Sequence, residues 1–148
     1  PCSTYDYLPT VSEAIGSNLS GDRPVDGESL LPLILGKTTK RNSYIPFASN
    51  IRLPRTAIIK GDFKFYTNLS TDDADALYHL HDDPAESTNL IEEHPELVQA
   101  MKADLKAWIE SCRKSFDGKD YKETYEKQGS FLKLDDVKTK KRNKNNRK

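Results

Sequence analysis

The sequence predicts an α+β fold in which a small antiparallel sheet of three to four strands packs against a long C-terminal helix. Segments with strand-like alternation lie between Ser43 and Leu80, and a helical period returns from His94 to about Lys114. The chain has 148 residues. A domain of that length buries about 70% of the surface of its unfolded chain, so one domain with a core is expected.

A short helix is expected at the N-terminus, where Ser3 or Thr4 can cap it and Gly16 can end it. Pro9 must lie in the first turn of this helix or kink it, because proline has no backbone N–H. The apolar residues spaced along one face of the helix are Leu8, Val11 and Ile15.

Small and polar residues between Gly16 and Ser29 predict a surface loop. One or two helical turns are expected to follow it. Their apolar residues are Leu30, Leu31, Ile34 and Leu35, and Gly36 closes the segment.

Two β-rich runs, Thr56–Lys60 and Phe63–Thr67, are joined at Gly61-Asp62, which is typical of a tight hairpin. In the second run the odd-numbered side chains are expected on the buried face. Residues 76–80 predict a further short strand. Residues 43–49 predict another, which Pro46 would confine to an edge of the sheet.

The helix from about 94 to 114 has Pro95 at a favoured first position and basic residues in its last turn. Its apolar stripe is wide enough to cover one face of a small sheet. The stripe consists of Leu97, Met101, Leu105, Trp108 and Cys112, widened by Val98 and Ile109. We interpret Met101, Trp108 and Cys112 as core residues, because such side chains at helical spacing usually pack.

The formal net charge of zero conceals an acidic body and a basic tail. Residues 1–112 carry 10 Lys or Arg against 17 Asp or Glu, whereas residues 113–148 carry 13 against 6. Residues 117–148 have no sustained period and are expected to be disordered. This tail either keeps the chain soluble or binds a polyanion through Lys138, Lys140, Lys141, Arg142 and Lys144. Nucleic acid is not the expected polyanion, because no aromatic residue follows Phe131.

Most catalytic signatures are missing from the sequence. The two cysteines, Cys2 and Cys112, have neither zinc-site spacing nor a nearby histidine. No nucleophile elbow, Gly-rich phosphate loop or membrane-spanning apolar run is present.

The stretch "HLHDD" at 79–83 allows two interpretations. His79 and His81 could share a strand face and bind a metal ion together with Asp82 or Asp83. Alternatively, the strand ends at Leu80 and an aspartate caps free backbone N–H groups in a turn. The turn is favoured, because metal binding would hold His81 in strand geometry while its neighbour turns away.

Three stretches in order, over residues 1 to about 112, resemble the closing portion of the sulfatase family, the arylsulfatase-like enzymes with an alkaline-phosphatase-type fold. The first comprises Asp6, Pro9 and Thr10, then Asp26, Gly27, Ser29, Leu30, Pro32, Leu33 or Leu35, and Gly36. The second is Gly61, Asp62, Phe63 and Lys64. The third is Leu77, Tyr78, Leu80, Asp83, Pro84, Glu86, Asn89 and Leu90. In the family the third signature has turn and packing roles, not metal ligation. Ile59 stands where the family commonly has an arginine, which argues against an anion contact from this strand.

The resemblance implies three parts: residues 1–40 as the helix and loop left over from a larger α/β catalytic domain, 41–116 as the C-terminal sulfatase subdomain, and 117–148 as the basic tail. It implies a non-catalytic piece of a periplasmic or secreted enzyme that hydrolyses aryl or carbohydrate sulfates. The parent's formylglycine, formed in a C/S-x-P/A-x-R motif, and its calcium are expected in a missing N-terminal domain, because neither cysteine here has that context.

The candidate substrate-rim residues are Arg41, Arg52 and Arg55, since loops on rigid scaffolds often carry specificity. No catalytic residue, cofactor or metal ligand is expected in this chain. The alternative is a stand-alone polyanion-binding module that acts through the basic tail.

Overall fold

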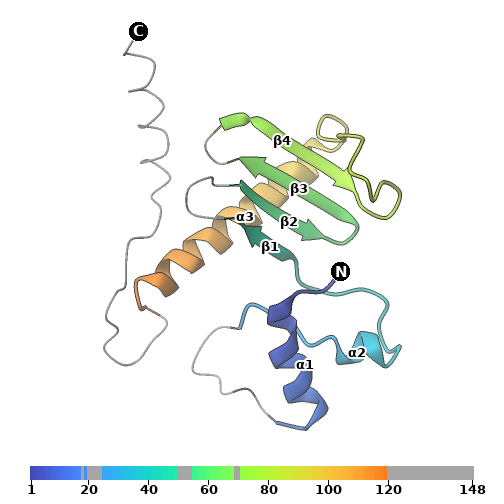
Figure 1. Cartoon of the computed structure of the whole chain (residues 1–148), viewed down its shortest axis with the longest axis vertical. Helices are drawn as coiled ribbons and strands as arrows, with labels where there is room; N and C mark the ends of the chain where they lie inside the picture. Colours follow the sequence, from blue (N-terminus) through green and yellow to red (C-terminus); the bar gives the residue numbers. More distant parts are fainter. Residues whose placement is uncertain (18, 20–24, 50–54, 69–70, 120–148) are drawn as a thin grey trace.

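The structure, a computed structural model, describes residues 1–17, 19, 25–49, 55–68 and 71–119, and gives only the backbone of 71–74. The elements in order are η1 (Thr4–Asp6), α1 (Tyr7–Ala14), α2 (Leu31–Ile34), β1 (Ile45–Ala48), β2 (Arg55–Lys60), β3 (Phe63–Asn68), β4 (Thr71–His79) and α3 (Pro95–Phe116). The sheet and α3 form two layers, and the N-terminal helices lie beyond the β1 side of the sheet (Figure 1). The predicted α+β class is confirmed.

The four strands follow one another in chain order, and every neighbouring pair is antiparallel. The predicted hairpin between β2 and β3 is present, with Gly61 at a φ of +60° that favours glycine. Pro46 lies on the edge strand β1, as expected. The fourth strand begins at Thr71, five residues before the predicted start, because pairing with β3 overrides the low strand propensity of the "TDDAD" segment.

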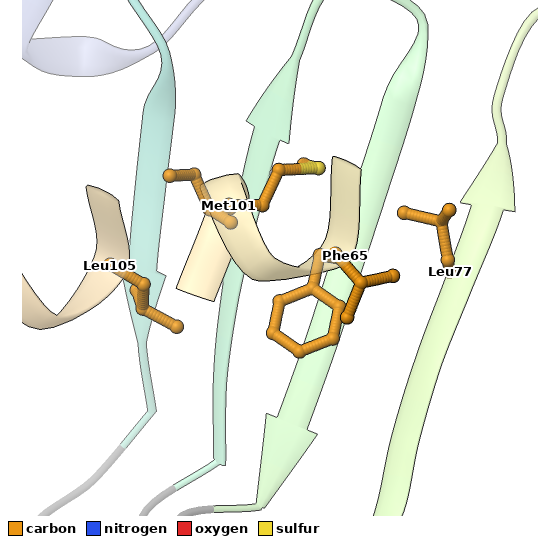
Figure 2. Packing of buried hydrophobic residues seen from close by; sticks show 6 residues of the cluster. Phe65, Leu77, Met101 and Leu105 are labelled. Atoms are coloured by element: carbon orange, nitrogen blue, oxygen red, sulfur yellow. The ribbon is translucent and has the colours of Figure 1, made fainter. Parts of the chain in front are cut away.

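The core lies between the sheet and α3. Ile58 pairs with Phe65, and Phe65 with Leu77, so these side chains share one face. They pack against the helix residues Val98, Met101 and Leu105, as Figure 2 shows for four of the six. Leu97, Trp108 and Ile109 are half-buried around this cluster. The predicted apolar stripe of the helix therefore covers the sheet, while Cys112 is half-buried near its end.

The two N-terminal helices have the predicted boundaries. Pro9 lies in the first turn of α1, and Gly16 and Gly36 follow the helices at a φ of +68°. Their apolar side chains, however, are largely in solvent: Ile15 is 72% exposed and Ile34 is 69% exposed. We define the α1–α2 face as Tyr7, Leu8, Val11, Ile15, Ile34 and Leu35, all of which are exposed. Within the described ranges, no helix is long and apolar enough to cross a membrane.

Candidate functional site

A buried ion pair joins the N-terminal helix to the loop before the sheet. The side chain of Asp6 is 2% exposed and that of Arg41 is 4% exposed. Arg41 Nη1 donates to Asp6 Oδ2 at 2.9 Å, and Nη2 donates to Oδ1 at 3.1 Å. This two-point geometry is the one in which a guanidinium binds a carboxylate most specifically.

All five N–H donors of Arg41 are engaged within the chain. Besides Asp6, Nε and Nη2 donate to the carbonyl oxygen and the hydroxyl of Ser43, each at 2.9 Å, and Nη1 donates to the carbonyl oxygen of Pro1 at 3.3 Å. A contact from Arg41 to a substrate would therefore require one of these bonds to break. The structure gives Arg41 an intramolecular role, and its role at a substrate rim stays a prediction.

The residues of the first family-like stretch form the surroundings of this ion pair. Glu28 donates its N–H to Asp6 Oδ1 at 3.1 Å, and its carboxylate accepts the N–H groups of Asn42 and Ser43, each at 2.9 Å. The hydroxyl of Thr10 donates to the carbonyl oxygen of Asp6 at 2.6 Å and accepts the N–H of Leu30 at 2.9 Å. We call Asp6, Thr10, Glu28, Arg41 and Ser43 the N-terminal clamp. Sequence reasoning missed Glu28, although its position directly after Gly27 was a signal.

Gly27 is required by close backbone packing within the clamp region. A Cβ at this position would lie 2.1 Å from the carbonyl oxygen of Tyr5, so the backbone would have to move. We expect Gly27→Ala to lower the free energy of unfolding by about 1–3 kcal/mol, as overpacking does. Urea unfolding at pH 7 measures this loss. Asp26→Ala is the comparison, because Asp26 is the exposed neighbour of Gly27 and its loss should change the free energy of unfolding by less than about 0.5 kcal/mol. Equal losses for the two variants would contradict the steric explanation.

The clamp should make stability depend on pH. Burial raises the pKa of the Asp6 carboxyl, but hydrogen bonds from Arg41 and from the N–H groups of Ser3 and Glu28 outweigh it, so the pKa lies below its ordinary value. The folded chain thus binds this proton less readily than the unfolded chain. The stabilisation is present above the unfolded pKa of about 4 and is lost as pH falls through the folded pKa.

We therefore expect the free energy of unfolding, measured with urea at pH 5 and pH 3, to fall with acid in the native chain. Asp83→Asn serves as control, because hydrogen bonds from the N–H groups of Thr88 and Ser87 also lower the pKa of Asp83. In Asp83→Asn the free energy of unfolding should still fall between pH 5 and pH 3. This remaining fall should disappear in the double variant that also carries Asp6→Asn. Persistence of the full dependence in that double variant would contradict the assignment.

The "HLHDD" stretch forms a turn. Strand β4 ends at His79, and Asp83 Oδ2 accepts the N–H groups of Ser87 and Thr88, each at 2.8 Å. His79 Nδ1 lies 2.9 Å from Asp82 Oδ2 without hydrogen-bond geometry. The predicted capping aspartate is confirmed as Asp83. Within the described part of the chain, no three His, Cys, Asp or Glu side chains are arranged to hold a metal ion.

The second and third family-like stretches meet at the far end of the sheet. Lys64 Nζ lies 2.6 Å from Glu86 Oε1, and Glu86 has a φ of +55°. Asn89 Oδ1 accepts the N–H of Leu77 at 3.0 Å, while the N–H of Leu90 donates to the carbonyl oxygen of Leu77 at 2.8 Å. These bonds satisfy backbone groups on the open edge of β4. The expected turn and packing roles of this signature agree with these contacts.

The structure does not gather the other candidate residues into one site. Arg55 is the exposed first residue of β2, and it is separate from the clamp that contains Arg41. Arg52 lies outside the described residues, as do Lys138, Lys140, Lys141, Arg142 and Lys144. Their roles at a substrate rim or in polyanion binding, and the disorder expected of the tail, stay predictions.

Comparison with known proteins gives matches among solved structures. Neither family models nor curated proteins match the chain. The Bacteroides thetaiotaomicron protein BT33336S-sulf, described with the metabolism of multiple glycosaminoglycans, is 26% identical, with a TM-score of 0.55 over 69% of this chain and 24% of its own. BT1596, a 2-O GAG sulfatase, is 19% identical, with a TM-score of 0.56 over 86% of this chain and 31% of its own. The chain has the fold of the C-terminal portion of a sulfatase.

A further sulfatase-fold match is BT4656, solved with its substrate D-glucosamine-2-N,6-O-disulfate. It is 21% identical, with a TM-score of 0.51 over 80% of this chain and 25% of its own. The chain thus spans about a quarter to a third of the length of these three structures. The calcium and formylglycine expected of a sulfatase do not fit the described residues, which offer neither a carboxylate cluster for the metal nor a cysteine in the required motif.

Proposed function

We propose that this chain is the non-catalytic C-terminal part of a sulfatase, which supports a preceding catalytic part and does not hydrolyse sulfate esters by itself. The observation that carries the proposal is its match to about a quarter of the BT33336S-sulf chain at 26% identity. The order of the three family-like stretches in the sequence supports it as well.

The exposed α1–α2 face supports the proposal that another part of the protein packs against this chain. Six large apolar side chains on two short helices and at the residues directly after them lie in solvent, and each is more than half exposed. Several large apolar side chains exposed on neighbouring segments are typical of an interaction site. The proposed occupant is the preceding part of the same sulfatase, because the matched structures extend well beyond the region that this chain covers.

The chemistry of sulfate-ester hydrolysis is consistent with a catalytic preceding part and a non-catalytic C-terminal part. Transfer of a sulfuryl group needs an activated nucleophile and a metal ion that offsets the developing negative charge. The proposal assigns both to the preceding part. We propose sulfated carbohydrates as substrates, since BT1596 is described as a 2-O GAG sulfatase and BT4656 with the substrate D-glucosamine-2-N,6-O-disulfate.

The test is an activity comparison between two purified proteins. One is the 148-residue chain, and the other is extended by the upstream coding region, which should contain a C/S-x-P/A-x-R motif. We expect only the extended protein to release sulfate from a sulfated monosaccharide. An upstream region without this motif, or sulfate release by the 148-residue chain after rigorous removal of contaminating hydrolase, would overturn the proposal.

A variant of the extended protein tests the proposed docking surface. Val11→Asp places a charge on the α1–α2 face, whereas Glu13→Asp changes an exposed residue of the same helix without altering charge. We expect Val11→Asp to expose the protein to proteolysis between its two parts and to lower its sulfate release. Equal behaviour of the two variants would remove the α1–α2 face from the proposal.

A further inference from the structure

The face of the sheet opposite α3 differs in composition from the α1–α2 face. Residues paired across neighbouring strands share a face, so Phe47, Ala57, Tyr66 and Ala76 form one row on this face. We call it the open face because α3 does not cover it, although Ile45 on the same face of β1 is buried. Phe47 is 43% exposed and Tyr66 is half-buried, whereas Ala57 between them and Ala76 on the far side of Tyr66 are small and buried. Each aromatic ring therefore stands beside a residue too short to cover it.

A positive charge lies next to this row. Arg55 precedes Ala57 by two residues on β2, so it projects from the same face, and it is exposed. Asn68, its partner on β3, is half-buried. The other cation on this face, Lys64, is neutralised by Glu86 at 2.6 Å. Arg55 makes no corresponding ion pair within the described residues.

The combination of side chains on the open face suits binding of a sulfated sugar better than packing against another protein. Permanent interfaces are depleted of charge at their centre, as the α1–α2 face is, whereas the open face combines aromatic rings with an arginine and an ion pair. Tyrosine suits positions where one side is apolar and the other wet. The C–H groups of a sugar ring can lie on such aromatic side chains, and a guanidinium presents paired donors that match an anionic oxygen pair such as that of a sulfate group.

We propose that the open face of the sheet, at Phe47, Tyr66 and Arg55, binds a sulfated sugar, with its ring against the aromatic side chains and its sulfate group at Arg55. This site would hold the carbohydrate without cleaving it. The choice of a sulfated carbohydrate rests on the proposed function.

The experiment titrates the full 148-residue chain, labelled with ¹³C at its tyrosine rings, with D-glucosamine 2-N,6-O-disulfate and observes the rings by NMR. We expect the Tyr66 resonance to move with the sulfated sugar and not with sodium sulfate. Tyr66→Ala and Arg55→Gln should each weaken binding by about tenfold, which is a change of about 1.4 kcal/mol. Unsulfated D-glucosamine should bind the native chain and Arg55→Gln equally weakly.

Tyr7→Ala is the matched control, because Tyr7 is exposed on α1, away from the sheet, and its loss should leave binding unchanged within twofold. If Tyr66→Ala fails to fold by circular dichroism, Arg55→Gln and Phe47→Ser decide the question. Movement of the Tyr7 resonance alone, or loss of binding only when Lys138, Lys140, Lys141, Arg142 and Lys144 are replaced by serine, would overturn the proposal. These results concern binding by this chain, so they leave the comparison of sulfate release intact.

Discussion

Replacing Arg41 with methionine is expected to lower the free energy of unfolding by about 3–5 kcal/mol, the cost of removing one partner of a buried ion pair. Asp6 would keep its carboxylate in a site that is 2% exposed, with two of its four hydrogen bonds lost. The carbonyl oxygen and hydroxyl of Ser43 would also lose their donors. Urea unfolding at pH 7, followed by Trp108 fluorescence and circular dichroism, measures the loss.

Two further variants separate the lost ion pair from a general effect of the substitution. Lys40→Met removes the neighbouring cation, whose exposed side chain lies 4.0 Å from Asp62, and should change the free energy of unfolding by less than about 1 kcal/mol. Asp6→Leu combined with Arg41→Met removes both charges of the buried ion pair and should recover part of the stability lost in Arg41→Met. Similar losses for Lys40→Met and Arg41→Met would show that the clamp does not stabilise the fold.

Local patterns were sufficient to predict the elements with strong periodicity. Helix α3 begins at Pro95 and buries the apolar stripe around Met101, because spacing along a helix determines which side chains share a face. The hairpin at Gly61 was predictable for the same reason, since its turn residues are adjacent in the chain. The early start of β4 was not, because its pairing with β3 decides it.

Which residues of the N-terminal clamp contact one another could not be predicted, although the sequence analysis had singled out Asp6, Thr10 and Arg41. Asp6 and Arg41 are 35 residues apart, and no local spacing rule connects them. Sequence reasoning named Arg41 as a candidate substrate-rim residue because loops on rigid scaffolds often carry specificity. Only the fold shows that its donors face Asp6 and Ser43. The same holds for Lys64 and Glu86, whose contact depends on the return of the chain after β4.

The two faces of the sheet should respond differently to the same substitution. Phe65→Ala removes a ring that is fully buried between the sheet and α3, where it packs with Met101 and Leu77. The cavity and the lost burial are expected to lower the free energy of unfolding by about 3–5 kcal/mol. Phe47→Ala makes the same chemical change on the open face, where the ring is 43% exposed.

For Phe47→Ala we expect a loss below about 1.5 kcal/mol, since 43% of the residue's surface stays in water and no closed cavity is left. Urea unfolding of both variants at pH 7, with equal slopes against urea, measures the difference. The contrast follows from α3 covering only one face of the sheet. Equal losses for the two variants would mean that the open face is also covered in the isolated chain, and that neither a sugar nor a second protein part can reach it.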